Sequence, residues 1–244
     1  MGLTDFLLQT TPQALPRWYG RLAGRLLAGV YEEIADRIVR EEDGNGRVLD
    51  FGTGPGELPV VLARHPGLRI DAVDVSDNML MAAEDRARET GATHVRFGLV
   101  EGMALPFESQ RYDWVVSTLV LHELKERAAD WLSLLFSRLR PGGTCLLLDL
   151  HRSLAVQEDV LLAALREEGL LPSWLPRGLL SKGWRALHSS LPTLDSVDAL
   201  LGDSRFGLAA GKRLLPLSVG SIEVQDALLW VEAKAPDVTI GPFS

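Results

Sequence analysis

The stretch that most constrains this fold is 48–56, which reads Val-Leu-Asp-Phe-Gly-Thr-Gly-Pro-Gly. An apolar run that contains one acid, Asp50, leads into glycines at every second position. The run predicts a buried strand, and the glycines predict a tight loop that opens a helix. Such a loop lets the backbone approach a ligand closely and directs helix N–H groups toward it. The chemistry of that ligand decides the function.

The rest of the chain alternates between strands and helices. This alternation predicts a Rossmann-like, doubly wound α/β fold with right-handed crossovers. We expect a mostly parallel, seven-stranded sheet that ends in an antiparallel hairpin, because only a Gly220-Ser221 turn separates the last two strands. The predicted strands are 47–51, 68–74, 94–99, 112–117, 144–150, 208–219 and 224–233, and the predicted helices are 12–40, 57–63, 76–89, 123–139, 156–167 and 194–201.

The length of 244 residues suits one domain with an added cap. We expect a single domain over 1–244. Its parts are a helical N-terminal segment (1–46), a ligand-binding core (47–150), an insertion (151–193), and a last helix with the hairpin (194–244).

Composition excludes several classes of function. The formal net charge of −8 is unfavourable for binding nucleic acid, and the basic residues are scattered. No apolar run is long enough for a membrane span, and the N-terminus lacks the basic start of a secretory signal. The single cysteine, Cys145, rules out an intrachain disulfide and a cysteine metal cluster. We therefore expect a cytoplasmic protein that acts on a small molecule, with no metal, no nucleic acid and no stable membrane insertion.

Asp50 helps to decide which class of ligand this glycine loop binds. A P-loop needs Gly-Lys-Ser/Thr, whereas Gly56 is followed by Glu57 and Leu58, and the dinucleotide fingerprint G-x-G-x-x-G differs from the G-x-G-x-G found here. A buried carboxylate repels a pyrophosphate, but it binds an ammonium group and offsets a sulfonium. S-adenosylmethionine carries both of these groups. The alternative, in which Asp50 only caps the loop backbone, also argues against phosphate.

Two further acids follow in the order that an adenosine needs. Asp74 ends the second predicted strand, where it can accept both hydroxyls of a ribose; the alternative is that it caps the next helix. Glu101 and Gly102 follow the third strand, where a carboxylate can accept from the exocyclic amine of adenine and a backbone N–H can donate to a ring nitrogen. Val75 and Met79 can pack on the adenine face or belong to the core.

Together these motifs resemble the class I S-adenosylmethionine-dependent methyltransferases, and most closely the small-molecule branch that includes the ubiquinone/menaquinone-biosynthesis enzymes. The matching segments are 48–56, 72–80, 101–107, 112–124 and 139–149, in the family's order and spacing. The resemblance implies S-adenosylmethionine as cofactor. The family usually has Asp where Glu101 stands, which shifts the adenine contact slightly. The cofactor contacts that it implies are Asp50, Phe51, Gly52, Thr53, Gly54, Gly56, Asp74, Val75, Met79, Glu101, Gly102, Met103, Ser117 and Tyr19.

Methyl transfer needs placement of the nucleophile and exclusion of water, and it needs a general base only when the nucleophile starts protonated. His122 and His151 follow the fourth and fifth strands and are the candidate bases; the alternative for each is a rim residue bonded to backbone. The segment 117–120 lacks the D/N/S-P-P-aromatic box of DNA amino-methyltransferases. Asp149 alone does not make the acid cluster of metal-dependent O-methyltransferases.

The acceptor is assigned to residues 151–193, where the family inserts its substrate cap. This insertion is rich in Leu and Trp and carries several basic residues, which predicts a site for a hydrophobic or aromatic acceptor or, alternatively, an ordinary cap core. Two other functions stay open at this point. One is a cofactor-binding regulator or scaffold without methyl transfer, and the other is an enzyme that uses the same site for different chemistry.

Overall fold

A computed structural model describes the core of the chain and several C-terminal stretches. Predictions that fall outside the described residues include those for Tyr19 and His151, for most of 151–193, and for the helices 156–167 and 194–201. The described residues are 24, 27–107, 111–150, 166, 191, 196, 208–209, 212–213, 218–225 and 228–235.

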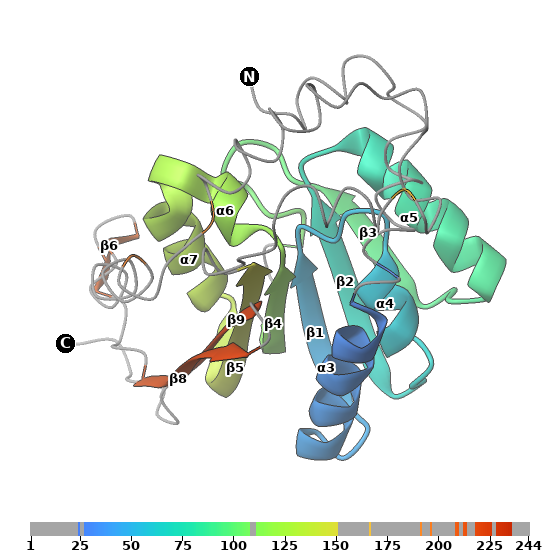
Figure 1. The fold of residues 1–244 in the computed structure, drawn as a ribbon, viewed down its shortest axis with the longest axis horizontal. Coiled ribbons are helices and arrows are strands. Elements are labelled where there is room, and N and C mark those ends of the chain that lie inside the picture. Colours follow the sequence, from blue (N-terminus) through green and yellow to red (C-terminus); the bar gives the residue numbers. More distant parts are fainter. Residues whose placement is uncertain are drawn as a thin grey trace.

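A seven-stranded sheet in the order β3-β2-β1-β4-β5-β9-β8 forms the centre of the described structure (Figure 1). The first five of these strands are parallel, whereas β9 is antiparallel to both β5 and β8. The expectation of a Rossmann-like α/β fold is confirmed. The strands are β1 (Gly46–Phe51), β2 (Leu68–Asp74), β3 (Val95–Leu99), β4 (Tyr112–Thr118), β5 (Leu139–Leu150), β8 (Ser218–Gln225) and β9 (Leu228–Lys234), and β6 (Leu208–Ala209) pairs separately with β7 (Lys212–Arg213).

The strand order reverses between β1 and β4. The chain builds outward from β1 through β2 to β3, then returns to the other side of β1 and continues through β4 to β5. Ligands of open α/β sheets bind at such a switch point, beyond the carboxyl ends of the strands. The topology therefore places the glycine loop after β1 at the expected ligand position.

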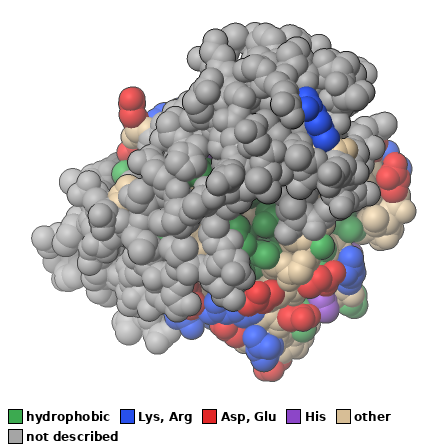
Figure 2. Space-filling view, viewed as in Figure 1, with side chains coloured by type: hydrophobic (Ala, Val, Ile, Leu, Met, Phe, Trp, Pro, Cys, Tyr) green, Lys and Arg blue, Asp and Glu red, His purple; other side chains and the backbone are tan. Residues whose placement is uncertain are grey.

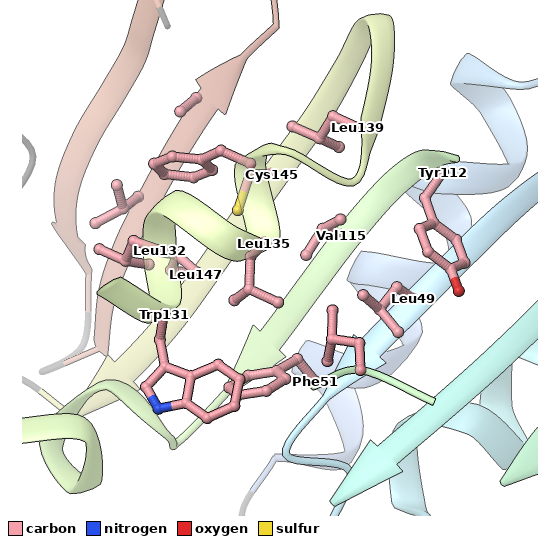
Figure 3. Close-up of a cluster of buried hydrophobic side chains, with 14 of the residues drawn as sticks. Leu49, Phe51, Tyr112, Val115, Trp131, Leu132, Leu135, Leu139, Cys145 and Leu147 are labelled. Atoms are coloured by element: carbon pink, nitrogen blue, oxygen red, sulfur yellow. The ribbon is translucent and has the colours of Figure 1, made fainter. Parts of the chain in front are cut away.

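The two faces of the sheet bury separate apolar clusters because successive strand residues point to opposite faces. On β1, Val48 packs with the cluster that contains α3 (Ala28–Glu41) and α4 (Glu57–Leu62), whereas Leu49 and Phe51 pack with the cluster that contains α7 (Ala128–Phe136). Figure 3 shows the second cluster, in which the Phe51 and Trp131 rings lie side by side with centroids 5.0 Å apart. Both faces of β1 are thus buried from Val48 to Phe51, as the apolar run in the sequence predicts.

The helix ends follow the capping signals in the sequence. α5 (Asp77–Thr90) begins with Ser76 as N-cap, whose side chain accepts from the Met79 N–H, and ends at Gly91 in the left-handed conformation. α3 buries Tyr31, Ile34 and Ile38 at helical spacing. The predictions for 57–63 and 76–89 are confirmed to within about one residue at each end.

The predicted helix 123–139 is wrong at both ends. The structure divides it into α6 (Leu121–Leu124), a 3-10 turn η1 (Lys125–Arg127) and α7, and Leu139 already pairs with Tyr112 as the first residue of β5. Pro141 and its neighbouring glycines therefore lie inside the strand and not before it. The β4–β5 register shifts between Tyr112 and Trp114, and at such an irregularity a residue without an N–H is tolerated.

The predicted turn of the C-terminal hairpin is also misplaced. Gly220 and Ser221 lie within β8, where the register with β9 shifts between Val219 and Ser221. β8 continues to Gln225, and β9 begins at Leu228. A glycine inside a strand marks a bulge as often as a turn, and here it marks the bulge.

Charged side chains of both signs are mixed along the lower part of the visible described surface (Figure 2). Among the exposed ion pairs, the Arg140 guanidinium pairs with Glu42 at 3.0 Å and also with Asp113. A different ion pair lies inside the sheet: buried Asp71 of β2 accepts from Nε and Nη2 of Arg96, both at 2.6 Å, and from the Tyr112 hydroxyl at 2.8 Å. Asp71 therefore ties β2 to β3 and to β4.

We expect Asp71→Ala to lower the free energy of unfolding by about 2–4 kcal/mol, because it leaves the buried Tyr112 hydroxyl and part of the Arg96 charge without their acceptor. Tyr112→Phe should cost only about 1 kcal/mol. The matched control is Asp85→Asn, which alters an exposed pair with Arg88 and should change stability by less than about 0.5 kcal/mol. Urea unfolding measures all three, and equal effects of the two aspartate changes would contradict the assignment.

Candidate functional site

The glycine loop has a backbone that only glycine adopts easily. Gly52, Gly54 and Gly56 have φ of 74°, 54° and 80°. Space is limiting as well, since a Cβ on Gly52 would lie 2.2 Å from Cγ2 of Val120. The loop therefore fits closely against the segment that follows β4.

The N–H groups of the loop point into the protein. Gly52 and Thr53 both donate to the carbonyl oxygen of Val73, at 2.8 and 3.0 Å. Gly54 donates to Oδ2 of Asp74 at 2.8 Å. These bonds fasten the loop after β1 to the carboxyl end of β2.

No N–H group remains within 52–56 for a ligand. Gly56 donates to the Thr53 carbonyl at 3.1 Å, and Pro55 has no N–H. The carbonyl oxygens of Gly52 and Gly54, in contrast, accept from none of the residues described. Over this segment the loop N–H groups are therefore used inside the protein, and the expectation about the N–H groups that open α4 at Glu57 stays a prediction. A loop that offers oxygens favours a cationic ligand and disfavours a phosphate.

Asp50 is the strongest indication of a ligand. Its side chain is 1% exposed, and neither carboxylate oxygen has a hydrogen-bond partner among the described residues. Burial raises the pKa of Asp50 to about 7, and the nearby Asp74 charge adds to this rise. The Thr53 hydroxyl lies close enough to oppose the rise, but its oxygen, too, has no hydrogen-bond partner among the described residues. An isolated buried carboxylate is costly unless a donor or a positive charge satisfies it. An ammonium group would supply both.

Asp74 holds the site together and still has lone pairs to offer. Its Oδ1 accepts from the Ser76 N–H at 2.9 Å while its Oδ2 accepts from Gly54. Burial raises the pKa of Asp74, and the N–H groups of Gly54, Ser76 and Val75 lower it. The capping role named as the alternative is therefore real. Each carboxylate oxygen can accept more than one hydrogen bond. Asp74 can therefore still bind a ribose, and this role stays a prediction.

The side chains expected around adenine lie at the neighbouring strand ends. Val75 is 67% exposed, an unusual state for a large apolar residue, and Met79 is half-buried. Glu101 and Gly102 form a tight turn in which Ala104 donates to the Glu101 carbonyl at 3.0 Å, and Gly102 has φ of 62°. Glu101 is exposed. The structure brings these residues to one edge of the sheet, beside Asp74.

Other candidates serve the fold with their side chains. Phe51 packs in the core against Trp131, and Met103 packs against the same cluster. The Ser117 hydroxyl donates to the Phe51 carbonyl at 2.9 Å, within the sheet. Any cofactor contact of Phe51 would therefore come from its backbone.

Arg86 is a supporting residue that sequence reasoning missed. Its Nε donates to the Pro55 carbonyl at 3.0 Å, and its Nη2 pairs with Oε1 of Glu57 at 2.5 Å. Arg86 on α5 thereby braces the glycine loop and the first residue of α4. No local signal marks this role, because Arg86 lies on an ordinary amphipathic helix 31 residues from Pro55.

His122 lies at the ends of β4 and β5 with a partner that the sequence did not assign to it. Nδ1 of His122 is 2.9 Å from Oδ1 and 3.1 Å from Oδ2 of buried Asp149, and the His122 backbone N–H donates to Oδ2 at 2.9 Å. The sequence could have indicated this pairing only through position. His122 follows β4 and Asp149 lies near the end of β5, and the carboxyl ends of these parallel neighbours meet at one edge of the sheet.

The described part of the chain contains neither a metal-binding cluster nor a membrane-spanning helix. It holds no grouping of three His, Cys, Asp or Glu side chains suited to a metal ion. It also holds no helix with the length and apolar character to cross a membrane.

Comparison with known proteins identifies the class of domain. Residues 48–143 match a family model described as a methyltransferase domain. The matched stretch, called the methyltransferase domain from here on, contains the glycine loop, Asp50 and Asp74. Ribosomal protein L11 methyltransferase from Brucella suis is 31% identical over 164 residues, which are 66% of this chain and 53% of that protein. The chain thus spans about half the length of the curated relatives that it matches.

Solved structures show the same fold around the methyltransferase domain. The plantazolicin methyltransferase BpumL, in complex with a substrate analog and S-adenosylhomocysteine, has a TM-score of 0.66 at 14% identity, with 96% and 94% of the two chains covered. Magnesium protoporphyrin IX methyltransferase from Synechocystis with bound S-adenosylhomocysteine has a TM-score of 0.56 at 19% identity and covers 85% and 82%. The class I S-adenosylmethionine-dependent fold is confirmed. The ubiquinone branch is not singled out by these likenesses.

The residues of the methyltransferase domain fit its cofactor, S-adenosylmethionine. The ammonium group would satisfy the orphaned Asp50 oxygens and the carbonyls of Gly52 and Gly54, which a phosphate could not do. Asp74 has acceptor capacity for a ribose, and exposed Val75 offers an apolar surface beside it. When bound, the cofactor supplies an activated methyl group.

Gly52→Ala should destabilise the methyltransferase domain by about 2–4 kcal/mol, because left-handed backbone strain adds to the clash with Val120. Gly91→Ala is the matched control: its φ is 76°, and nothing lies within 4 Å of the added Cβ, so it should cost only about 1–2 kcal/mol. The double variant Gly52→Ala/Val120→Ala should regain part of the loss. Thermal and urea unfolding test this, and equal costs for the two glycine changes would exclude the clash.

The affinity for S-adenosylhomocysteine should depend on the ionisation of Asp50. Burial raises the pKa of Asp50 to about 7 in the free protein, so the carboxylate that binds the ammonium is fully present only above that pH. Below pH 7 we expect the Kd to rise by up to about tenfold per pH unit, with proton release on binding. Calorimetry at pH 5.5, 6.5 and 7.5 in buffers of different ionisation enthalpy measures both quantities.

Asp50→Asn is the control for this pH dependence. It should bind S-adenosylhomocysteine weakly at every pH, with no pH slope. Because the pKa of Asp50 is raised in the folded protein, its ionisation lowers the stability of the free protein as the pH rises from about 4 through 7. The Asp50→Asn variant does not ionise at this position, so its free form should be more stable than the wild type at pH 8. A wild-type Kd that stays constant between pH 5.5 and 7.5 would contradict this role of Asp50.

Proposed function

We propose that this protein transfers the methyl group of S-adenosylmethionine to a small-molecule acceptor in the cytoplasm. The observation that carries the proposal is the buried, unpartnered carboxylate of Asp50, beside a loop whose N–H groups are all used internally. This arrangement fits a ligand with a positively charged methionine end. It fits neither a nucleotide phosphate nor an empty structural loop.

The described residues divide the work of binding the cofactor. Asp50 and the loop carbonyls hold the ammonium group, and Asp74 accepts from the ribose hydroxyls. Glu101 and the Gly102 backbone bind the adenine edge, while Val75 and Met79 cover its face. Because Asp74 is already fixed by two N–H groups, the ribose meets a carboxylate whose orientation is set before binding.

An apolar acceptor is favoured by the segment that follows β4. Val120, Leu121 and Leu124 are half-buried apolar residues of this segment, which lies against Gly52 of the cofactor loop and carries His122. A polar protein tail would gain little from such a surface.

A protein acceptor is the second candidate, because the Brucella suis relative is named for ribosomal protein L11. The match covers 53% of that relative. Solved structures of the same fold include enzymes named for plantazolicin and for magnesium protoporphyrin IX. We therefore place the small-molecule acceptor first.

The direct test combines binding with turnover. We expect S-adenosylhomocysteine to bind with a Kd in the micromolar range, and Asp50→Ala to weaken it by at least about 100-fold, the loss of a buried charge-assisted contact. Asp113→Asn, a strand aspartate that accepts from the Arg47 N–H, is the matched control and should bind normally. A folded protein that does not bind S-adenosylhomocysteine would overturn the proposal.

Turnover separates the remaining alternatives. The purified protein is given S-adenosylmethionine with a labelled methyl group, together with either a panel of aromatic small molecules or ribosomal protein L11. Label in a small product supports the proposal, and label in L11 supports the protein acceptor. Binding without release of S-adenosylhomocysteine would indicate a regulator, and a product without the mass of one methyl group would indicate different chemistry.

A further inference from the structure

The ends of β4 and β5 hold a buried acid–histidine pair outside the residues assigned to the cofactor. Asp149 is 1% exposed and accepts from the His122 N–H at 2.9 Å, from Nδ1 of His122 at 2.9 Å and from the Leu150 N–H at 2.7 Å. A carboxylate only accepts, so Nδ1 must carry a proton. The Asp149 carboxylate thus fixes both the position and the tautomer of the ring.

The other ring nitrogen faces a second, partly exposed carboxylate. Nε2 of His122 is 3.5 Å from Oε1 of Glu123, whose side chain is 49% exposed, whereas the His122 side chain itself is 9% exposed. Asp149 from β5 and Glu123 from α6 are the charged groups that face the ring within the described chain. Nε2 is therefore the nitrogen whose proton can change.

The segment that carries His122 is fixed to the cofactor loop. Leu119 has φ of 59°, a strained value for a branched apolar residue, and its N–H donates to the Leu148 carbonyl at 2.7 Å. This turn places Val120 directly against Gly52. Backbone strain of this kind persists only where surrounding contacts hold it, and such positions cluster at functional sites. The chain thus holds His122 close to the loop that binds the methionine end.

We propose that Asp149 is a positioning residue that holds His122 with Nε2 as the proton-accepting atom, and that the methyl acceptor presents a hydroxyl oxygen to it. The inference rests on the proposed function. A base is useful only for a nucleophile that starts protonated, and an oxygen that must lose a proton meets that condition, whereas an amine with a free lone pair does not.

The proton and electron balance is simple. The hydroxyl oxygen forms the new bond to the methyl carbon, and the electron pair of the broken carbon–sulfur bond stays on sulfur. The hydroxyl proton passes to neutral Nε2 of His122, and the imidazolium that results is paired with Asp149. Water takes that proton after the product leaves. This is the role that a buried aspartate has beside a histidine base in acyl transfer.

The basicity of the ring fits a phenol-like hydroxyl. Burial lowers the pKa of His122, but the bonds and charges of Asp149 and Glu123 outweigh this effect and raise it to about 9. An unperturbed phenol has a pKa of about 10, so proton transfer between the two would be nearly balanced. Below pH 9 most of the free enzyme carries an imidazolium, and methylation should therefore accelerate as pH rises from 7 to 9.

A purely structural role for the pair is the competing explanation, since the same bonds fasten α6 to β5. The first test needs no acceptor: histidines are labelled with ¹⁵N and titrated by NMR in the S-adenosylhomocysteine complex, with His122→Asn used for assignment. We expect Nδ1 to stay protonated and Nε2 to titrate with a pKa of about 9, falling by at least one unit toward 6.5 in Asp149→Asn. Asp113→Asn should leave the titration unchanged. An unprotonated Nδ1, or the same pKa in Asp149→Asn, would overturn the proposal.

The second test distinguishes a proton-handling role from a structural one. Simple phenols and the matching anilines are assayed with methyl-labelled S-adenosylmethionine at pH 8. His122→Asn and Asp149→Asn should lower phenol methylation by about 10²–10⁴-fold and aniline methylation by less than about threefold. Equal losses for the two acceptors, or transfer to anilines alone, would overturn the proposal. S-adenosylhomocysteine calorimetry on each variant separates this outcome from failure of the cofactor site itself.

Discussion

The whole site depends on the way the carboxyl end of β2 binds its neighbours. The Val73 carbonyl accepts two N–H groups of the glycine loop, and the Asp74 carboxylate accepts Gly54 on one oxygen and Ser76 on the other. The Asp74 carbonyl accepts the Val100 N–H at 2.8 Å. Two residues therefore fix the loop after β1, the start of α5 and the end of β3 relative to one another. These are the three places where an adenosylated ligand would be contacted, so its binding geometry exists before the ligand arrives.

Asp50 is informative because the other buried acids of the sheet are satisfied. Asp71 and Asp149 are as deeply buried, yet each accepts hydrogen bonds from several donors. The fold is thus able to surround an acid with donors, and it does not do so at Asp50. A carboxylate left in this state weakens the free protein, and it is stabilised when a cationic ligand binds. The unpaired carboxylate of Asp50 thus lowers the stability of the free protein, but it would raise the affinity for a cationic ligand and lower the affinity for a phosphate.

Much of the cofactor half could be predicted from the sequence because its signals are local. Ser76 caps α5, Gly91 ends it, and the glycines after β1 have the positive φ that their spacing implies. The failures have a common cause in contacts between distant segments. The start of β5 is set by pairing with Tyr112, and Gly220 is a bulge because of its register with β9. The direction of the loop N–H groups depends on Val73, and the brace on the loop comes from Arg86; neither partner is visible in a local motif.

The switch point divides the chemistry between two halves of the sheet. Asp50 and Asp74 lie on β1 and β2, and Glu101 follows β3. His122 lies on α6, which follows β4, and Asp149 lies near the end of β5. The close approach of Val120 to Gly52 joins the two halves. Residues after β4 and β5 can therefore change without disturbing Asp50 or Asp74, since the cofactor half is fastened by its own hydrogen bonds. This separation explains how solved structures that are only 14–19% identical share the fold while their names point to different acceptors. We therefore propose that the β4–β5 half binds the acceptor, because Asp149 holds His122 there in a position to accept a proton.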